Sequence, residues 1–431
     1  MATRLRRLAL IGALAATLLC VFSPAGLATA ASAGAPPLVG VDGSDLFGMP
    51  RSAWDGFLSE MVAAHVQFVR EDAAWEAVQP SAPTAKGPGY NWAWTDAIAS
   101  ALARHRLQWL PIIDYSTSWS ASYSQSDGLL KPRQPDLLSP PKPVDVPYFA
   151  AYAAAFVKRY GPGGSFWAAN PRLRPEPVTQ VQIWNEPNAN YFWMPSPDAQ
   201  AYASLYEQAR SAILAAAPKV KVAVGALGNP SWTFLDQLFS ALGGARDVAA
   251  VADTPYASRP EDVVDNVAGL RRALDAHGDR SATIQVSEFG WPTRGSESFV
   301  ATLTDPGRAT ALVRTMQMLA TGNYGVSLIA PYTWVTPQQD PNNAEDWYGI
   351  VNADGSQTAS SLAYAAEAKR IEALAASVKR SHKRNRKHTS KQNRKRRHKR
   401  KHRARSAKAH SAPASPSSSG ASGGLLGWLL R

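Results

Sequence analysis

The sequence predicts a (β/α)8 barrel, and three observations favour this fold. Between Pro37 and Val378, eight short runs rich in Val and Ile alternate with longer segments of helical spacing. The short runs do not alternate strictly between apolar and polar residues, which is typical of parallel strands buried on both faces. Polar and aromatic residues gather where these runs end. An open doubly wound sheet is the alternative, but it usually has a Gly-rich turn after its first strand and none follows Val41.

The strands are expected at Leu38–Val41, Val66–Arg70, Gln108–Asp114, Val178–Asn185, Val220–Gly225, Val248–Ala252, Thr283–Glu288 and Val326–Thr333. Start signals mark several of the helices between them. Pro197 is expected at the first position of a helix, with Asp198 in its first turn. Pro260 and the pair Asp305-Pro306 open two more, which end at Gly278 and Gly322.

Residues 1–30 have the pattern of a secretory signal peptide rather than of the folded protein. Arg4, Arg6 and Arg7 precede an apolar run, and the segment ends in the small residues Ala28-Thr29-Ala30. The run is shorter than the about 20 apolar residues that cross a bilayer, so no transmembrane span is expected after cleavage. The single cysteine, Cys20, lies inside this segment, which excludes a disulfide or a cysteine nucleophile from the mature chain.

The net charge of +13 is divided very unevenly along the chain. Residues 1–30 hold three of the 46 Lys and Arg, residues 379–408 hold 17 and Arg431 is one more, so 25 remain in the body against all 33 Asp and Glu. The body, residues 37–378, is therefore predicted to be an acidic catalytic domain. Residues 379–410 are predicted to be a disordered basic tail, and 411–431 a Ser-, Pro- and Gly-rich end with a short apolar terminus.

The basic tail has two interpretations. It either only solvates the protein, or it binds an anionic polymer through residues 379–408, such as a cell-wall polymer or a nucleic acid. Together with the signal peptide, the second interpretation predicts a secreted, cell-wall-associated protein.

The ends of the expected strands point to the chemistry, because barrel enzymes carry their active sites there. Glu186 and Glu288 follow the fourth and seventh strands, 102 residues apart, and a barrel brings both to one rim. Cleavage of a glycosidic bond needs such a pair, one carboxyl to protonate the leaving oxygen and one to attack the anomeric carbon. A gap of about 5 to 5.5 Å between the carboxyls would retain the configuration.

Neighbouring side chains are expected to separate the two pKa values. Arg70, at the end of the second strand, would favour the ionised form of Glu288, and desolvation beside Trp184 and Trp193 would keep Glu186 protonated. Asp114, at the end of the third strand, is a further candidate for substrate binding. The scattered histidines have no metal-ligand spacing, so neither a metal nor a cofactor is expected.

Trp193, Trp291 and Trp334 also fall near this rim. Any one of them could be a core residue, but several together favour a cleft in which flat rings stack on sugars.

The two glutamate motifs resemble those of glycoside hydrolase clan A. Residues 181–188, VQIWNEPN, are similar to its acid/base motif, and residues 286–292, VSEFGWP, to its nucleophile strand. The likeness is greatest to family 39, which holds β-xylosidases, iduronidases and exopolysaccharide hydrolases, and next to the family 5 cellulases. Phe68-Val-Arg70 and the segment Trp347-Tyr-Gly349 extend the likeness over nearly the whole body.

This resemblance implies a retaining hydrolase of β-linked poly- or oligosaccharides, with Glu186 as acid/base and Glu288 as nucleophile. It also implies that Asn185 holds the 2-hydroxyl of the sugar, that Arg70 and Tyr256 order the nucleophile, and that Trp334 floors the first sugar site. Relatives often carry His-Pro-Tyr after the sixth strand, where this chain has Thr254-Pro-Tyr. That departure weakens any transfer of substrate specificity.

Two other functions remain open on the sequence alone. The chain could be a barrel that binds carbohydrate without cleaving it, for which Thr254 is the one hint. It could also be an adhesin that works through its basic tail. The sugar, its linkage and the choice between attack within a chain or at its end are not determined by the sequence.

Overall fold

The computed structural model describes residues 35–123, 138–244 and 248–381. In this part of the chain nine parallel strands form one sheet in the order β1-β9-β8-β7-β6-β5-β4-β3-β2. They are β1 (Leu38–Val39), β2 (Val41–Asp42), β3 (Phe68–Ala74), β4 (Gln108–Asp114), β5 (Gln180–Asn185), β6 (Lys221–Gly228), β7 (Ala250–Thr254), β8 (Thr283–Val286) and β9 (Val326–Ile329). The predicted (β/α)8 barrel is confirmed.

The first expected strand, Leu38–Val41, is two short strands that together close the ring. Leu38 of β1 pairs with Leu328 of β9, whereas Val41 of β2 pairs with Val69 of β3. Gly40 lies at the break, where an added Cβ would come within 2.5 Å of the Phe68 carbonyl oxygen. The chain can change partners here because glycine lets the two backbones approach closely.

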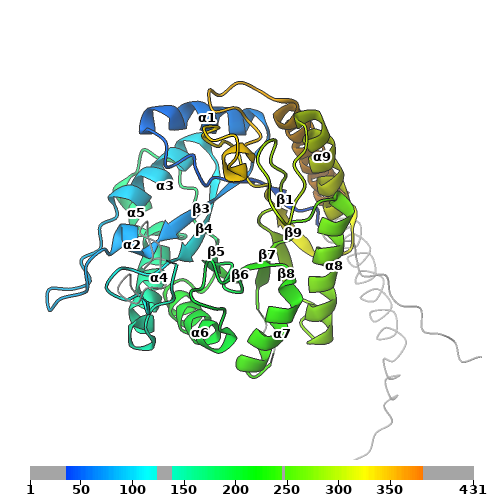
Figure 1. The fold of residues 1–431 in the computed structure, drawn as a ribbon. Helices are drawn as coiled ribbons and strands as arrows, with labels where there is room; N and C mark the ends of the chain where they lie inside the picture. Colours follow the sequence, from blue (N-terminus) through cyan, green and yellow to red (C-terminus); the bar gives the residue numbers. More distant parts are fainter. Residues whose placement is uncertain (1–34, 124–137, 245–247, 382–431) are drawn as a thin grey trace, which may run out of the picture. The chain divides into compact units, whose positions relative to one another are not determined.

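Helices lie outside the ring of strands and cover it (Figure 1). They are α1 (Arg51–Ala63), α2 (Trp75–Val78), α3 (Ala93–His105), α4 (Val146–Tyr160), α5 (Ser165–Ala169), α6 (Ala199–Ala216), α7 (Ser231–Ala241), α8 (Pro260–Ala276) and α9 (Asp305–Thr321), followed by a helix over 359–381. Short 3-10 turns occupy Pro143–Asp145 (η2) and Ala344–Trp347 (η3).

The helix start signals are confirmed at two sites and shifted at a third. Pro260 is the first residue of α8, and Asp305 that of α9, where the hydroxyl of Thr304 accepts from the amide of Gly307. Helix α6 begins at Ala199, two residues after Pro197. The side chain of Asp198 caps it instead by accepting from the amides of Gln200 and Ala201, since a carboxylate before the first turn satisfies two free N–H groups.

The inside of the barrel is divided into an apolar and a polar layer. Phe68, Leu110, Leu328 and Ala330 form a small apolar cluster, separate from the large core between strands and helices. The polar layer holds Arg70 of β3, whose Nε donates to Gln182 of β5 at 2.9 Å, and Gln182 in turn donates to Gln285 of β8 at 2.8 Å. This chain of hydrogen bonds fixes Arg70 beneath the ends of the strands.

Most of the segments predicted at the two ends of the chain lie outside the described residues. The expected signal peptide and nearly all of the basic tail lie outside the described residues, and the expected boundary at 378/379 falls inside the helix 359–381. No helix in the described ranges is long and apolar enough to cross a membrane.

Candidate active site

Glu186 directly follows β5 and is held by an unusual backbone. Its φ is 41° and that of Trp184 is 70°, values that non-glycine residues rarely adopt. Asn188 stabilises the turn by donating to the Gly228 carbonyl oxygen at 2.6 Å and accepting from the Gly228 amide at 2.8 Å. Strained positions of this kind cluster at functional sites, where the surrounding structure holds them in place.

Glu288 follows β8 and is 8% exposed. Its two carboxylate oxygens contact different donors. Arg70 donates to Oε1 at 2.5 Å, and the Tyr256 hydroxyl donates to Oε2 at 3.0 Å. Both donors stabilise negative charge on Glu288.

Arg70 is almost fully buried, and its guanidinium donates hydrogen bonds to four side chains. Besides Gln182 and Glu288, it donates to Asp42 at 2.7 Å and to the side-chain oxygen of Asn185 at 2.7 Å. Its single positive charge is therefore shared between two carboxylates, Asp42 and Glu288. The sequence analysis did not find Asp42, because nothing in residues 38–42 distinguishes an inward-facing carboxylate from an ordinary strand-end residue.

This sharing changes the expected electrostatics of the nucleophile. Burial raises the pKa of Glu288 above its ordinary value, Arg70 opposes that rise, and the charge of Asp42 adds to it. Burial likewise raises the pKa of Glu186, with Thr254 and Arg70 opposing the rise. Arg70 favours the ionised form of Glu288, as expected, but desolvation and Asp42 act against it.

The two glutamates differ in the donors that face them. The side chain of Glu288 accepts from a guanidinium and a phenol, whereas within the described ranges that of Glu186 contacts one hydroxyl, Thr254 Oγ1, at 2.6 Å. When one proton is shared by the pair, these donors favour the negative charge on Glu288 and the proton on Glu186, whereas burial and Asp42 act in the opposite direction on Glu288.

Both glutamates line one cleft of about 780 Å³ at the mouth of the barrel. Its wall is acidic and aromatic. The carboxyl groups belong to Asp42, Glu71, Asp72, Glu186, Glu288, Glu297 and Glu345, and the aromatic rings to Tyr115, Tyr191, Phe192, Tyr256, Phe299, Tyr332 and Tyr348. Arg70 is the one basic residue among the described residues that line it.

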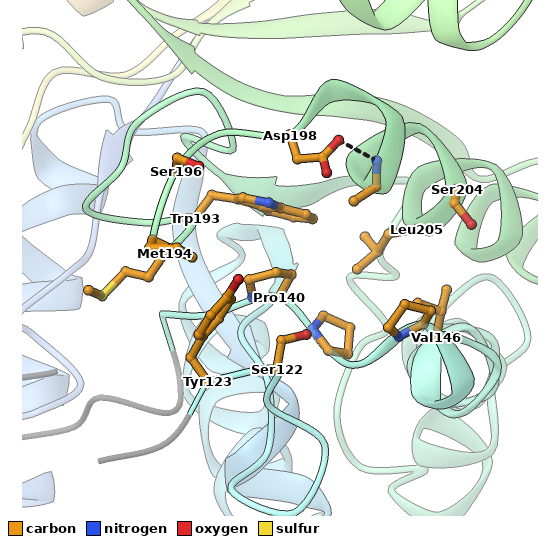
Figure 2. A pocket seen from close by; sticks show the side chains of 14 residues that line it. Ser122, Tyr123, Pro140, Val146, Trp193, Met194, Ser196, Asp198, Ser204 and Leu205 are labelled. Atoms are coloured by element: carbon orange, nitrogen blue, oxygen red, sulfur yellow. Dashed lines mark hydrogen bonds between the residues drawn. The ribbon is translucent and has the colours of Figure 1, made fainter. Parts of the chain in front are cut away.

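Of four other predicted site residues, two lie at the cleft and two lie away from it. Asn185 and Tyr256 line the cleft beside the glutamates. Asp114, at the end of β4, is fully buried behind the wall, and burial raises its pKa well above the ordinary value. Trp193 is 1% exposed and lines a smaller hollow of about 270 Å³ between η2, α4 and α6, facing Tyr123 and Pro140 (Figure 2).

Trp291 and Trp334 lie in the core instead of facing the cleft. Trp291 is 0% exposed, packs on Phe289 and donates to the Ser258 carbonyl oxygen at 3.1 Å. Trp334 is 1% exposed and packs edge-on against Tyr364. The aromatic rings that line the cleft are instead those of tyrosine and phenylalanine, which the sequence does not single out because tyrosines are scattered through the chain.

No group of three or more His, Cys, Asp and Glu side chains in the described ranges is arranged to hold a metal ion.

Comparison with solved structures places the fold among glycoside hydrolases. The chain is similar to a family 39 glycoside hydrolase from the gut symbiont Bacteroides cellulosilyticus WH2, with a TM-score of 0.57, 20% identity and coverage of 77% of this chain and 64% of that chain. A monomeric β-xylosidase from Caulobacter crescentus CB15 gives a TM-score of 0.56 at 19% identity, covering 77% of this chain and 69% of that one. A family 39 enzyme from Xanthomonas axonopodis pv. citri gives 0.58 at 17% identity, with 77% and 67% covered.

These likenesses show the barrel fold that glycoside hydrolases of family 39 have. The chain spans slightly less than two thirds of the length of the Bacteroides protein. No protein-family model and no curated protein matches the sequence.

Proposed function

We propose that this chain is a secreted retaining glycoside hydrolase that cleaves β-linked poly- or oligosaccharides. The observation that carries the proposal is the asymmetric pair in the cleft. Glu288 accepts from Arg70 and Tyr256, as a nucleophile that must carry charge requires, and Glu186 contacts the Thr254 hydroxyl. A protonated carboxyl and an ionised one at the same cleft are the groups that glycoside hydrolysis uses.

The reaction follows from these roles. Glu288 attacks the anomeric carbon while Glu186 gives its proton to the leaving oxygen, so that the glycosidic bond breaks and a glycosyl–enzyme ester forms. The ionised Glu186 then takes a proton from water. The oxygen of that water attacks the anomeric carbon and releases Glu288 as a carboxylate, which restores the starting state.

The charges of the cleft favour sugars without acidic groups. Arg70 is bonded to Asp42 and Glu288, and no other cation among the described lining residues is placed to receive a carboxylate or sulfate. Glu297 and Glu345 extend the negative charge along the wall. A uronic acid would meet like charges here, whereas the aromatic rings suit the apolar faces of neutral sugars.

Export and attachment to an anionic polymer are part of the proposal and rest on the sequence. The pattern of residues 1–30 supports secretion, and the 17 Lys and Arg of 379–408 support electrostatic binding to a cell-wall polymer or nucleic acid. Removal of residues 382–431 should abolish salt-sensitive retention on anionic polymers and leave cleavage of small soluble substrates unchanged. Equal retention without the tail would refute this role.

The deciding experiment measures reducing-end release from a panel of neutral β-linked polysaccharides, their uronic-acid-bearing counterparts and aryl β-glycosides. The wild type is compared with Glu288→Gln and with Glu372→Gln, a matched change on the exposed face of helix 359–381. We expect release by the wild type and Glu372→Gln only. The first-formed product, followed by NMR, should keep the β configuration.

Three results would contradict the proposal at different points. Binding of oligosaccharides without any release would favour a non-catalytic barrel. An inverted product would assign Glu288 as a base instead of a nucleophile. Better cleavage of the acidic polysaccharides would refute only the argument from the charge of the cleft.

A further inference from the structure

The Thr254 hydroxyl contacts two oxygens of different kinds, one in a carboxyl group and one in a backbone carbonyl. Thr254 ends β7 and is 1% exposed. Its Oγ1 lies 2.6 Å from Oε1 of Glu186 and 3.1 Å from the carbonyl oxygen of Leu227 on β6. Both distances are within hydrogen-bonding range.

A threonine hydroxyl has only one hydrogen, and a backbone carbonyl can only accept. Thr254 therefore cannot give a full hydrogen bond to Leu227 and to Glu186 at once. Two complete arrangements exist. When Glu186 is protonated, it donates to Thr254, which donates to Leu227. When Glu186 is ionised, Thr254 turns its hydrogen to the carboxylate and leaves Leu227.

We propose that Thr254 is a positioning residue for Glu186, whose hydroxyl reverses its hydrogen bond each time Glu186 gains or loses the catalytic proton. The inference rests on the proposed function, in which Glu186 is protonated before the glycosidic bond breaks and ionised in the glycosyl–enzyme state. No proton passes through Thr254. Its hydroxyl rotates, so that Glu186 has one fixed partner in both states and its carboxyl stays aimed at the leaving oxygen and then at water.

Other charged groups near Glu186 do not replace this contact. Arg70 of β3 and Glu288, which follows β8, act on it through their charges, and so do Asp253 of β7 and Glu345 of η3. In the described ranges, however, none of these groups hydrogen-bonds to the Glu186 carboxyl. Thr254 thus provides the one local interaction that can depend on the protonation of Glu186 and still hold the side chain in place.

The Leu227 carbonyl provides a direct readout of the reversal. Labelling leucine with ¹³C at the carbonyl and glycine with ¹⁵N restricts the spectrum to Leu–Gly peptide bonds, among them Leu227–Gly228. Leu242–Gly243 and Leu426–Gly427 serve as internal controls. We expect the Leu227 carbonyl shift to change with pH in the wild type, with the same midpoint as the Glu186 carboxyl, while the two control signals do not follow that midpoint.

Three variants test the assignment. Thr254→Ser keeps the hydroxyl and should keep the titration of the Leu227 signal. Thr254→Val keeps the shape without the hydroxyl, and Glu186→Gln removes the titrating group, so both should abolish it. On aryl glycosides, Thr254→Val should lose about 10- to 100-fold in kcat with KM nearly unchanged, because a hydrogen bond to a charged group is worth that much. Thr254→Ser should recover most of the loss.

The outcomes separate this inference from the proposed function. A Leu227 signal that stays constant while Glu186 titrates would overturn the reversal. So would a Thr254→Val enzyme as active as the wild type. If the wild type cleaves no glycoside but the Leu227 signal follows Glu186, the proposed function fails and the reversing contact stands.

Discussion

Replacement of Arg70 by methionine tests the central electrostatic interaction of the site. Methionine has a similar length but no charge, so Asp42 and Glu288 lose their shared cation, and Gln182 and Asn185 each lose a donor. Breaking a buried ion pair costs about 3–5 kcal/mol, and each neutral hydrogen bond adds about 1 kcal/mol. The free energy of unfolding should therefore fall by about 5 to 7 kcal/mol near pH 9.5, above the pKa of Glu288.

The loss should be smaller in acid, and the sign follows from Glu288. Burial raises its pKa from 4.5 to about 8 in the folded state, so its contribution to stability is fully present below pH 4.5 and is lost as the pH rises through about 8. Without Arg70 the pKa rises further. Near pH 5 Glu288 is protonated, so the loss should be smaller there by the share of the broken ion pair that Glu288 contributes.

Chemical denaturation of the wild type and Arg70→Met at about pH 5 and about pH 9.5 measures both values. Arg104→Met is the matched control. Arg104 is half-exposed and pairs with an exposed carboxylate, Asp55, at 3.1 Å, so its loss should cost no more than about 1 kcal/mol at either pH. Equal destabilisation of Arg70→Met at the two pH values would refute the reasoning, since unpaired buried charge would then not be the cause.

Three further predictions concern single side chains. Tyr256→Phe should lower kcat/KM about 10- to 100-fold. It should also move the acid limb of the pH–rate profile to higher pH, because the hydroxyl lowers the pKa of Glu288. An acid limb at the same pH in the variant would contradict this. Trp334→Ala should cost about 3–5 kcal/mol of unfolding free energy, and KM for a small aryl glycoside should stay the same unless the ring contacts sugar. Asp198→Ala should remove the cap of α6 at a cost of about 1 kcal/mol in denaturation and leave turnover intact.

The sequence was sufficient for the fold because the signals that define a barrel are local. Runs of Val and Ile predict strands, and Pro and Gly mark the helix ends, as at Pro260. The closure at Gly40 could not be predicted in the same way. It depends on the distance between Gly40 and Phe68, two residues 28 positions apart, and a run of apolar residues looks the same whether it forms one strand or two.

The site was predictable where strand ends carried the signal and unpredictable where side-chain direction decided the outcome. Glu186, Glu288 and Tyr256 follow strands, so a barrel places them on one rim. Trp334 also follows a strand, but its ring turns into the core and packs on Tyr364. A tryptophan near a rim fits a stacking site and a packed core equally well, and only the structure distinguishes them.

Asp42 changes how the chemistry at this site is understood. If Arg70 served Glu288 alone, the nucleophile would be firmly ionised and the pair would hold its proton on Glu186 at almost any pH. Because the guanidinium also bonds to Asp42, its effect on Glu288 is limited, and burial keeps the pKa of both glutamates high. The position of the shared proton then depends on short contacts, Tyr256 on one carboxyl and Thr254 on the other. It follows that these two hydroxyls, although they carry no charge of their own, should act on the pH dependence of catalysis together with the arginine.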